Sequence, residues 1–400
     1  MASLFSYFLA TLACLLGIPV AVLFVEIVAA LALTRRKLSH QPIQDLRRRV
    51  AVIIPAHNES SGLLPTIRDI KAQLLTSDRL LVVADNCVDD TAAVAATAGA
   101  ETIERNEPTR KGKGYALDIG LKHLSLDPPA VVIIIDADCR IAEGSIDQLA
   151  ITCATTQRPV QALDLMTAPD ESPINYSIAE FAWRVKNWVR PLGLNTLNLP
   201  CQLMGTGMAF PWEVIRSAHL ASGSLVEDLK LGLDLAQTGS PPLFCPTAII
   251  KSHFPLSFEG ADSQRKRWEG GHINMILTTA PCFIYESIAR GNLGLLALTL
   301  DLAVPPLSLL VMLLAGMFSV AGLAALFGFS SAALTISATC IMALVVAIFL
   351  AWLKFGRDLL PPSAIFSVAS YIFAKLPIYR RLLSGSSAPQ WTKTDRKKNE

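Results

Sequence analysis

Runs of apolar residues alternate with amphipathic stretches through the middle of the chain. The runs "RVAVIIPA", "RLLVVAD" and "VVIIID" have no polar alternation and are rich in branched side chains, which predicts strands buried on both faces. Between them, "IRDIKAQLL", "DDTAAVAATAGA" and "GYALDIGLKHL" have helical spacing, and "AETIERN" predicts one more short strand. Strands that alternate with helices predict a parallel sheet in a doubly wound α/β fold.

Two longer apolar blocks flank this region. The first contains Glu26 as its one charged residue between Ser3 and Leu33 and is long enough to span a bilayer. Nothing basic precedes its apolar core, so we expect an uncleaved anchor over residues 1–34 and not a signal peptide. The second block, residues 293–353, predicts two spans over 300–326 and 332–353 joined by a short outer loop.

Basic residues predict the orientation of these spans. Six follow the anchor: Arg35, Arg36, Lys37, Arg47, Arg48 and Arg49. By the positive-inside rule they lie in the cytoplasm, and so does the region between the apolar blocks. We expect residues 360–400 to form an interfacial helix and a basic cytoplasmic tail, with one further span as the alternative.

Two acidic residues lie within the apolar blocks, Glu26 in the first and Asp301 in the second. An acid in a membrane span is costly and indicates pairing or function. Both lie near the predicted span ends, where a side chain can also reach the interface. Pairing and interfacial exposure are therefore both open.

The composition agrees with a membrane protein. Hydrophobic residues make up 52% of the 400 residues and charged residues 17%, whereas a soluble domain has about 25% charged residues. The net charge of +2 argues against nucleic-acid binding by bulk electrostatics. The cysteines include no CxxC pair, which argues against a zinc site or a disulfide framework and fits a reducing cytoplasm.

Polar side chains follow three predicted strands at their carboxyl ends: Asn58 and Glu59, Asp85 and Asn86, Asp136 and Asp138. Parallel sheets bind ligands at this edge, so the pattern predicts one cleft there. No GxGxxG follows the first strand and the chain has no GxxxxGK[ST], which argues against a dinucleotide site and a P-loop.

The segment "TRKGKGYAL" provides three cations, Arg110, Lys111 and Lys113, beside glycines that allow close approach of the backbone. Cations that face the pair Asp136 and Asp138 indicate a metal-bound diphosphate. Two such carboxylates suit Mg²⁺ or Mn²⁺, with phosphate oxygens and water as the other ligands.

In this order, "PAHNE", "VVADNC", "RKGKGYAL", "DADC", "VEDLKLGLDL" and "QRKRW" resemble the motifs of the membrane-embedded family-2 glycosyltransferases. This branch includes cellulose, chitin and hyaluronan synthases and enzymes of bacterial exopolysaccharide synthesis. The resemblance covers residues 50–275 by motif. It implies a glycosyltransferase-A type catalytic domain over residues 50–250, with a Rossmann-like, mostly parallel sheet. It also implies a nucleotide-sugar donor, most often a UDP-sugar, and a bacterial inner or plasma membrane with this domain in the cytoplasm.

The same resemblance implies site residues for the donor. It assigns the nucleotide to Pro55, Glu59, Asp85, Lys113 and Asp136, and the metal ion to Asp138. The positive partner of the two aspartates is then a divalent cation bridging to the diphosphate.

Inverting sugar transfer needs a base for the acceptor hydroxyl and a group that stabilises the leaving diphosphate. Glu227 and Asp228 begin a predicted helix, where adjacent acids are commonly only complementary to the helix dipole. By the resemblance they match the family's base motif, with Asp228 as the base, although Val226 stands where Thr is common.

"QRKRWEGG" lies in a segment, residues 251–292, that we expect to form amphipathic interface helices. A basic helix on the membrane surface is the simpler interpretation. The resemblance instead assigns Arg267 to the leaving diphosphate, and Gln264 and Trp268 to the acceptor.

The resemblance therefore implies an inverting, metal-dependent hexosyltransferase that extends a polysaccharide at the cytoplasmic membrane face. Three spans are few for a polymer channel unless a second copy or an export partner adds helices. The alternative is a distributive enzyme that adds one sugar to a lipid or lipid-linked acceptor. A non-catalytic subunit or transporter would have degenerate motifs, and a nucleotidyltransferase would need neither QxxRW nor a membrane.

Overall fold

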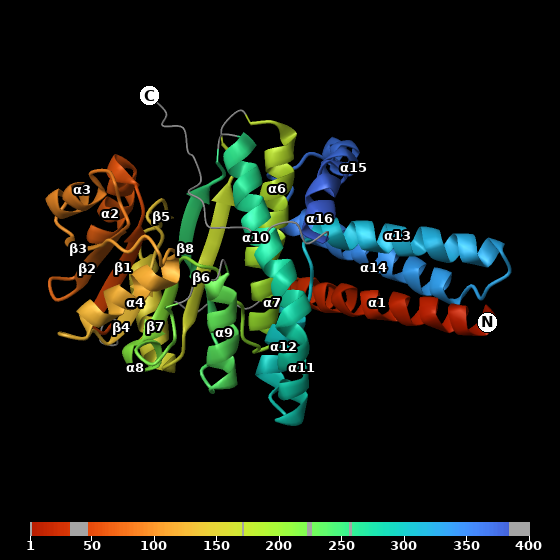
Figure 1. Ribbon diagram of the computed structural model, residues 1–400, viewed down its shortest axis with the longest axis horizontal. Coiled ribbons are helices and arrows are strands. Elements are labelled where there is room, and N and C mark those ends of the chain that lie inside the picture. Colours follow the sequence, from red (N-terminus) through yellow and green to blue (C-terminus); the bar gives the residue numbers. More distant parts are fainter. Residues whose placement is uncertain (1, 33–46, 170–171, 222–225, 256–257, 384–400) are drawn as a thin grey trace.

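The computed structural model describes residues 2–32, 47–169, 172–221, 226–255 and 258–383. Figure 1 shows a sheet domain on one side and a stem of long helices that projects away from it on the other. The helices α6 (Ile174–Arg184) and α10 (Phe258–Thr278) lie between these two parts.

The strands of the described chain form one sheet in the order β3-β2-β1-β4-β7-β6-β8-β5. Their bounds are β1 Val50–Ala56, β2 Arg79–Asp85, β3 Glu101–Arg105, β4 Val131–Ile134, β5 Arg140–Ile141, β6 Val160–Thr167, β7 Met208–Pro211 and β8 Leu243–His253. The strands β1 to β4 run parallel, as do β6 and β8. Only β7 and β5 run antiparallel to their neighbours. The predicted strands and the mostly parallel sheet are confirmed.

Helices cover both faces of this sheet. They are α2 (Leu64–Lys71), α3 (Thr91–Thr97), α4 (Lys113–Leu124) and α5 (Ser145–Thr156). Alternate residues of β1 point to opposite faces: Ile54 packs in one core with Ile67 of α2, and Ile53 in a second core with Leu117 of α4. Burial on both faces explains the continuous apolar runs of the strands.

Between β6 and the stem, helices precede, separate and follow the strands β7 and β8. They are α6, the π-helical turn η4 (Val185–Val189), α7 (Arg190–Thr196), α8 (Trp212–Ile215), α9 (Glu227–Gln237), α10, α11 (Ala280–Ala289) and α12 (Leu293–Leu302). A π turn inside a helix is rare and is often found at functional sites.

Three helices of the described chain are long and apolar enough to cross a membrane: α1 (Ala2–Ala32), α13 (Leu307–Leu326) and α14 (Ala332–Phe355). They pack together through side chains such as Leu23, Leu314 and Leu344. The prediction that the second span begins at residue 300 is wrong. The helix α12 ends at Leu302, because Pro305 and Pro306 have no N–H to continue it.

The segment after α14 forms two short helices, α15 (Ile365–Ala374) and α16 (Leu376–Leu383). Neither has the length of a membrane span. Exposed Phe366 and Phe373 of α15 suit an interface between water and lipid, which stays a prediction. Most of the predicted basic tail lies outside the described residues.

Glu26 and Asp301 both pair with one residue of the sheet domain, Arg190 of α7. The Arg190 Nε lies 2.9 Å from Glu26 Oε2, and its Nη2 lies 2.5 Å from Asp301 Oδ1. All three side chains are buried. Of the two alternatives for the acids, the structure therefore shows pairing and not exposure at the interface.

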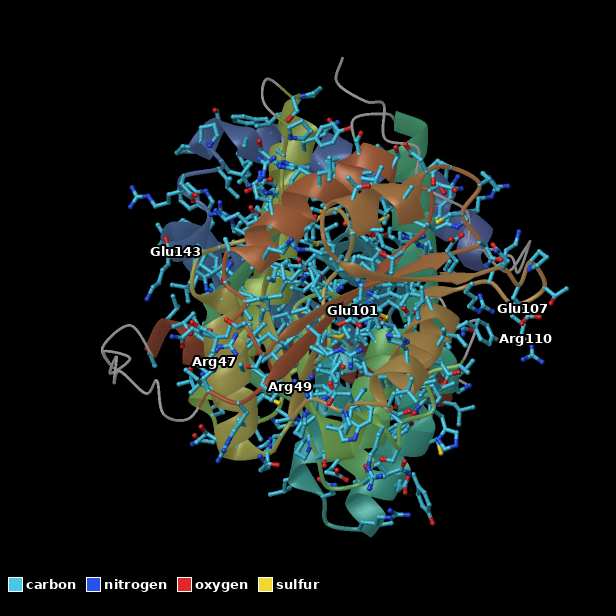
Figure 2. The ribbon with its side chains drawn as sticks, turned by 90° about the vertical axis from the view of Figure 1, so that its left-hand side faces the viewer. Arg47, Arg49, Glu101, Glu107, Arg110 and Glu143 are labelled. Atoms are coloured by element: carbon cyan, nitrogen blue, oxygen red, sulfur yellow. The ribbon has the colours of Figure 1, made fainter. Side chains whose placement is uncertain are left out.

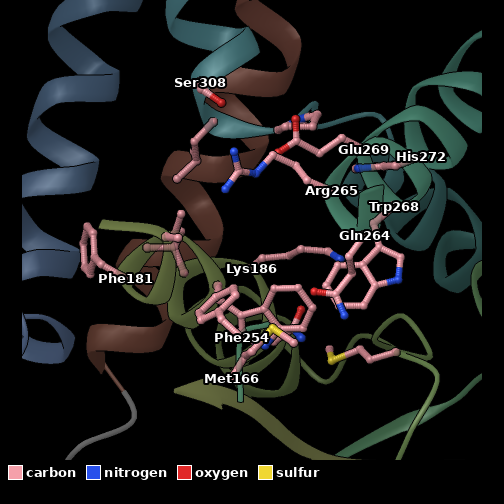
Figure 3. A pocket seen from close by; sticks show the side chains of 18 of the residues that line it. Met166, Phe181, Lys186, Phe254, Gln264, Arg265, Trp268, Glu269, His272 and Ser308 are labelled. Carbon is pink, nitrogen blue, oxygen red and sulfur yellow. The ribbon is translucent and has the colours of Figure 1, made fainter. Parts of the chain in front are cut away.

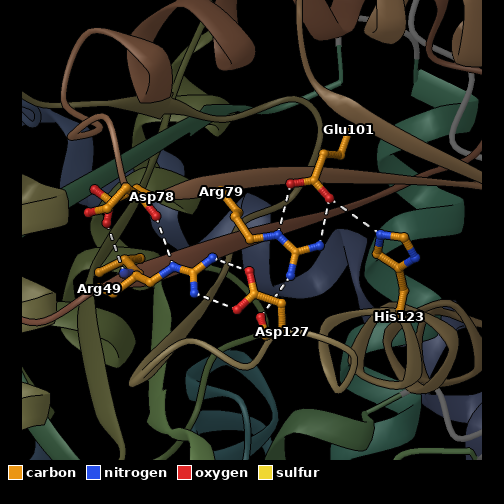
Figure 4. A network of polar contacts seen from close by, with 8 residues as sticks. Arg49, Asp78, Arg79, Glu101, His123 and Asp127 are labelled. Carbon is orange, nitrogen blue, oxygen red and sulfur yellow. Dashed lines mark hydrogen bonds and ion pairs between the residues drawn. The ribbon is translucent and has the colours of Figure 1, made fainter.

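Two of the basic residues from which the membrane orientation was predicted form ion pairs with carboxylates of the sheet domain. Arg47 pairs with Asp78 and Asp147, and Arg49 pairs with Asp127. Figure 4 shows the Arg49–Asp127 pair beside that of Arg79 and Glu101, at the strand starts opposite the predicted cleft. The basic residues 35–37 lie outside the described residues, so the orientation stays a prediction.

Candidate active site

A cavity of about 1450 Å³ lies between the carboxyl ends of the strands, α10 and the stem. Every residue assigned above to donor, metal, base or acceptor lines it: Pro55, Glu59, Asp85, Lys113, Asp136, Asp138, Glu227, Asp228, Gln264, Arg267 and Trp268. The structure thus brings together motifs that are widely separated in the sequence.

Lys113 and Asp136 lie at one end of this cavity, which we call the donor end because it holds the residues predicted to bind the donor. The Lys113 Nζ lies 2.5 Å from Asp136 Oδ1 and donates a second hydrogen bond of 2.6 Å to the Gly205 carbonyl. Of the three cations of "TRKGKG", Lys113 alone lines the cavity. Arg110 and Lys111 are exposed and do not line the cavity, and Figure 2 shows Arg110 at the periphery.

Asp85 carries an ion pair that the sequence analysis did not identify. The Arg105 Nη1 lies 2.5 Å from Asp85 Oδ1. Asp85 and Arg105 are register partners at the ends of the parallel strands β2 and β3. The sequence does place a cation, Arg105, at the end of the next predicted strand. That it pairs with Asp85 can be recognised only once the register of the two strands is known.

The amides beside these acids have a structural role. Asn58 and Asn86 have φ values of 56° and 52° and do not line the cavity. The Asn58 Oδ1 accepts a hydrogen bond from the Val88 N–H, and the Asn86 Oδ1 accepts one from the Glu107 N–H. Asparagine tolerates this left-handed backbone, so the two residues hold the loops and do not face the cavity.

Glu227 and Asp228 occupy the first turn of α9 and face the donor end. A Cβ built on Gly205 would lie 3.5 Å from Asp228 Oδ2, and Gly205 has a φ of +90°, so this loop needs glycine. Burial raises the pKa of Glu227 to about 7. The negative charge of Asp228 also raises this pKa, and the positive charge of Lys113 lowers it. Burial also raises the pKa of Asp228, opposed by Lys113 and Lys186.

Val226 joins this helix to the QRKRW segment of α10. A Cβ built on Gly271 would lie 2.8 Å from Val226 Cγ1, so the two helices approach as closely as a glycine allows. Val226, which stands where Thr is common, therefore makes an apolar packing contact between the start of α9 and the helix α10.

Aromatic side chains line the other end of the cavity, the acceptor end. The rings of Trp268 and Trp183 have centroids 5.1 Å apart, and Lys186 Nζ lies 5.2 Å from the Trp183 centroid. Figure 3 shows Gln264, Trp268 and Lys186 around the same open space. The roles assigned to Gln264 and Trp268 stay predictions.

Asp164 and Lys186 line the cavity and were missed by sequence reasoning. Burial, and next Asp136, raises the pKa of Asp164 to about 7. Asn187 of η4 donates a hydrogen bond of 2.9 Å from Nδ2 to Asp164 Oδ2. A lone acid in the apolar strand "VQALDLMT" could have indicated Asp164, whereas no pattern indicates the π turn that carries Lys186.

Asp136 and Asp138 could provide one side of a divalent metal site. Within the described residues, no group of three or more His, Cys, Asp or Glu side chains could hold a metal ion by itself. A hard cation at Asp138 would therefore complete its shell with oxygens of a bound diphosphate and water, which Mg²⁺ and Mn²⁺ accept. The residues present fit such a shared site.

From the acceptor end the cavity continues toward the stem as an apolar arm. Its lining includes Val311, Leu314, Leu344, Ile348, Phe349 and Val368, from α13, α14 and α15. The polar residues predicted to be catalytic and the apolar side chains of the stem therefore share one cavity.

Comparisons with known proteins identify the family and the fold. Residues 47–271 match a family model described as "Glycosyltransferase like family 2". A stretch of 100 residues is 36% identical to an uncharacterized glycosyltransferase of Mycobacterium tuberculosis, covering 25% of this chain and 41% of that protein. The chain thus matches less than half the length of this relative.

Two solved structures are similar. One is the mannosyltransferase PcManGT from Pyrobaculum calidifontis in complex with GDP-Man and Mn²⁺, with TM-score 0.56, 17% identity and coverage of 95% of this chain and 100% of that chain. The other is glucosyl-3-phosphoglycerate synthase from Mycobacterium tuberculosis, with TM-score 0.43, 20% identity and coverage of 60% and 84%. The family match and the first structure confirm the predicted glycosyltransferase-A type fold.

Proposed function

Because the chain belongs to the glycosyltransferase-like family 2, we propose that it transfers a sugar from a nucleotide-sugar to an acceptor at the membrane. The observation that carries this proposal is the single cavity, which joins Asp138, Asp228 and Arg267 to the apolar arm. PcManGT is described in complex with GDP-Man and Mn²⁺, and we propose the same classes of donor and cation here, with a UDP-sugar as the donor.

The residues of the cavity suit an in-line displacement with inversion. Asp228 takes the proton of the acceptor hydroxyl as that oxygen attacks the anomeric carbon, and the bond from this carbon to the diphosphate breaks. Lys113 and Arg267 stabilise the negative charge that develops on the departing diphosphate. Mg²⁺ or Mn²⁺ held by Asp138 would supply further charge neutralisation.

The apolar arm supports a lipid or lipid-linked acceptor over a growing polysaccharide. A polysaccharide carries many hydroxyl groups, each of which needs a hydrogen-bond partner when removed from water. Side chains such as Val311, Leu344 and Ile348 offer none, whereas they match a hydrocarbon chain. The enzyme then adds one sugar to each acceptor, and polysaccharide extension is the alternative.

In this proposal α1, α13 and α14 span the membrane, and residues 50–250 form the catalytic domain in the cytoplasm. The acceptor enters the apolar arm from the bilayer, and the donor enters the cavity from the water. The helices α15 and α16 lie at the interface between the two.

The test uses the full chain purified in detergent with Mn²⁺, a lipid extract and each of several radiolabelled nucleotide-sugars. We expect label in the organic phase, with an activity that falls by at least about 100-fold in Asp228→Asn. Asp234→Asn is the matched control, because Asp234 lies on the same helix, is half-exposed outside the cavity and pairs with Lys230. Label in an insoluble polymer would support the polysaccharide alternative, and full activity of Asp228→Asn would contradict the assigned base.

A further inference from the structure

Besides Lys266 and Arg267 of the QRKRW segment, four further cations line the acceptor side of the cavity and differ in their partners. Arg190 pairs with Glu26 and Asp301, and Lys375 pairs with Glu269 at 2.6 Å. In contrast, Lys186 and Arg265 have no ion pair with any residue that the structure describes. All four lie on α7, η4, α10 or the α15–α16 junction, where the apolar arm begins.

Lys186 is held in place although it lacks a carboxylate partner. The π turn η4 presents it to the cavity, and the next residue, Asn187, is anchored by its hydrogen bond to Asp164. The Trp183 ring lies 5.2 Å from Lys186 Nζ and supports the ammonium by a cation–π contact. The ammonium therefore has a defined position in the cavity.

Arg265 extends from α10 toward the same space. Figure 3 shows its side chain across the open space from Lys186. Arg265 is half-buried, and a guanidinium partly removed from water costs free energy that an anion can compensate. Two such cations face the space that an acceptor would occupy.

This cationic pair differs from the cation at the donor end. Lys113 bonds Asp136 and the Gly205 carbonyl, next to the aspartates assigned to the nucleotide and the metal. Lys186 instead contacts Trp183, which packs against Trp268 of the QRKRW segment. The pair therefore belongs to the acceptor end.

We propose that Lys186 and Arg265 form a subsite for an anionic group, phosphate or carboxylate, in the head group of the lipid acceptor. This proposal rests on the proposed function and names the class of its acceptor: an amphiphile with an acidic head group that also carries the attacking hydroxyl. Its hydrocarbon chain occupies the apolar arm. The planar guanidinium of Arg265 matches two oxygens of a phosphate or carboxylate, and Lys186 adds a point charge.

The experiment measures binding and needs no turnover. The full chain in non-ionic detergent is incubated with phosphatidylglycerol, with diacylglycerol of the same acyl chains, or with glycerol 3-phosphate, and retained ligand is measured by native mass spectrometry. The first probe has anion, hydroxyl and chains, the second lacks the anion, and the third lacks the chains. We expect phosphatidylglycerol to be retained at least about tenfold better than either of the others.

The double variant Lys186→Gln/Arg265→Gln should lose this preference over diacylglycerol. Arg216→Gln is the matched control, because Arg216 is an exposed arginine that pairs with Glu213 away from the cavity. Binding of UDP with Mn²⁺ to the double variant, measured by calorimetry, reports whether it is folded.

Three results would overturn the proposal. They are an unchanged lipid preference in the double variant, equally tight binding of glycerol 3-phosphate, and loss of UDP binding by a variant that is folded by circular dichroism. The last would assign the pair to the donor. Lipid preference without any sugar transfer would instead contradict the proposed function alone.

Discussion

Gly193 of α7 packs directly against the main chain of α1 at Glu26. A Cβ built on Gly193 would lie 1.9 Å from the Glu26 carbonyl oxygen, so only glycine fits. One turn earlier on α7, Arg190 pairs with the Glu26 side chain. Backbone packing and an ion pair thus join the sheet domain to the first stem helix at one place.

Gly193→Ala should lower stability, because α7 and α1 must separate to admit a methyl group. Overpacking of this kind costs about 1–3 kcal/mol or more. Gly316→Ala is the control, since Gly316 lies in α13 with no atom near its Cβ position. Thermal unfolding in detergent checks this, and equal Tm values for the two variants would contradict the packing argument.

Arg190→Met should destabilise the protein more than Glu26→Gln. The first change leaves two buried carboxylates without their cation, and breaking a buried pair in this way costs about 3–5 kcal/mol. The second removes one of two acids and leaves the Asp301 pair intact. Denaturant unfolding of both variants in one detergent compares them, and an equal or reversed order would show that Arg190 is not the central partner.

The rate of sugar transfer should fall as the pH drops through about 7. The pKa of Glu227 is raised to about 7 and that of Asp228 is also raised, so acid protonates the pair and removes the base. A raised carboxyl pKa places this loss at a higher pH than for an exposed acid, and activity rises with pH until the pair is ionised. The pH dependence of kcat/KM checks it, and a flat profile between pH 5 and 8 would contradict it.

Removal of divalent cations by EDTA should abolish transfer, and Mn²⁺ or Mg²⁺ should restore it. Asp138→Asn should need a higher Mn²⁺ concentration and lose about 100-fold in kcat/KM, which corresponds to about 2.7 kcal/mol of transition-state stabilisation. Asp118→Asn is the control, because Asp118 pairs with Lys122 outside the cavity. Full activity in EDTA would refute a metal-dependent mechanism.

The sequence by itself determined the features that depend on local patterns. Apolar runs such as Val50–Ala56 predicted the parallel strands, because a strand buried on both faces needs branched apolar side chains throughout. Asp136 and Asp138 were singled out because the carboxyl ends of parallel strands converge on one edge of the sheet. Asp228 was singled out by the resemblance of its motif to that of a known family, and it lines the same cavity.

Only the tertiary structure decided the features that depend on distant residues. Arg190 meets Glu26 and Asp301 from positions 164 and 111 residues away, and no local pattern indicates such partners. Lys186 lines the cavity from a π turn, and helical periodicity does not reveal such a turn. The apolar arm likewise exists only where α13, α14 and α15 meet the catalytic residues, because a cavity is set by packing between elements.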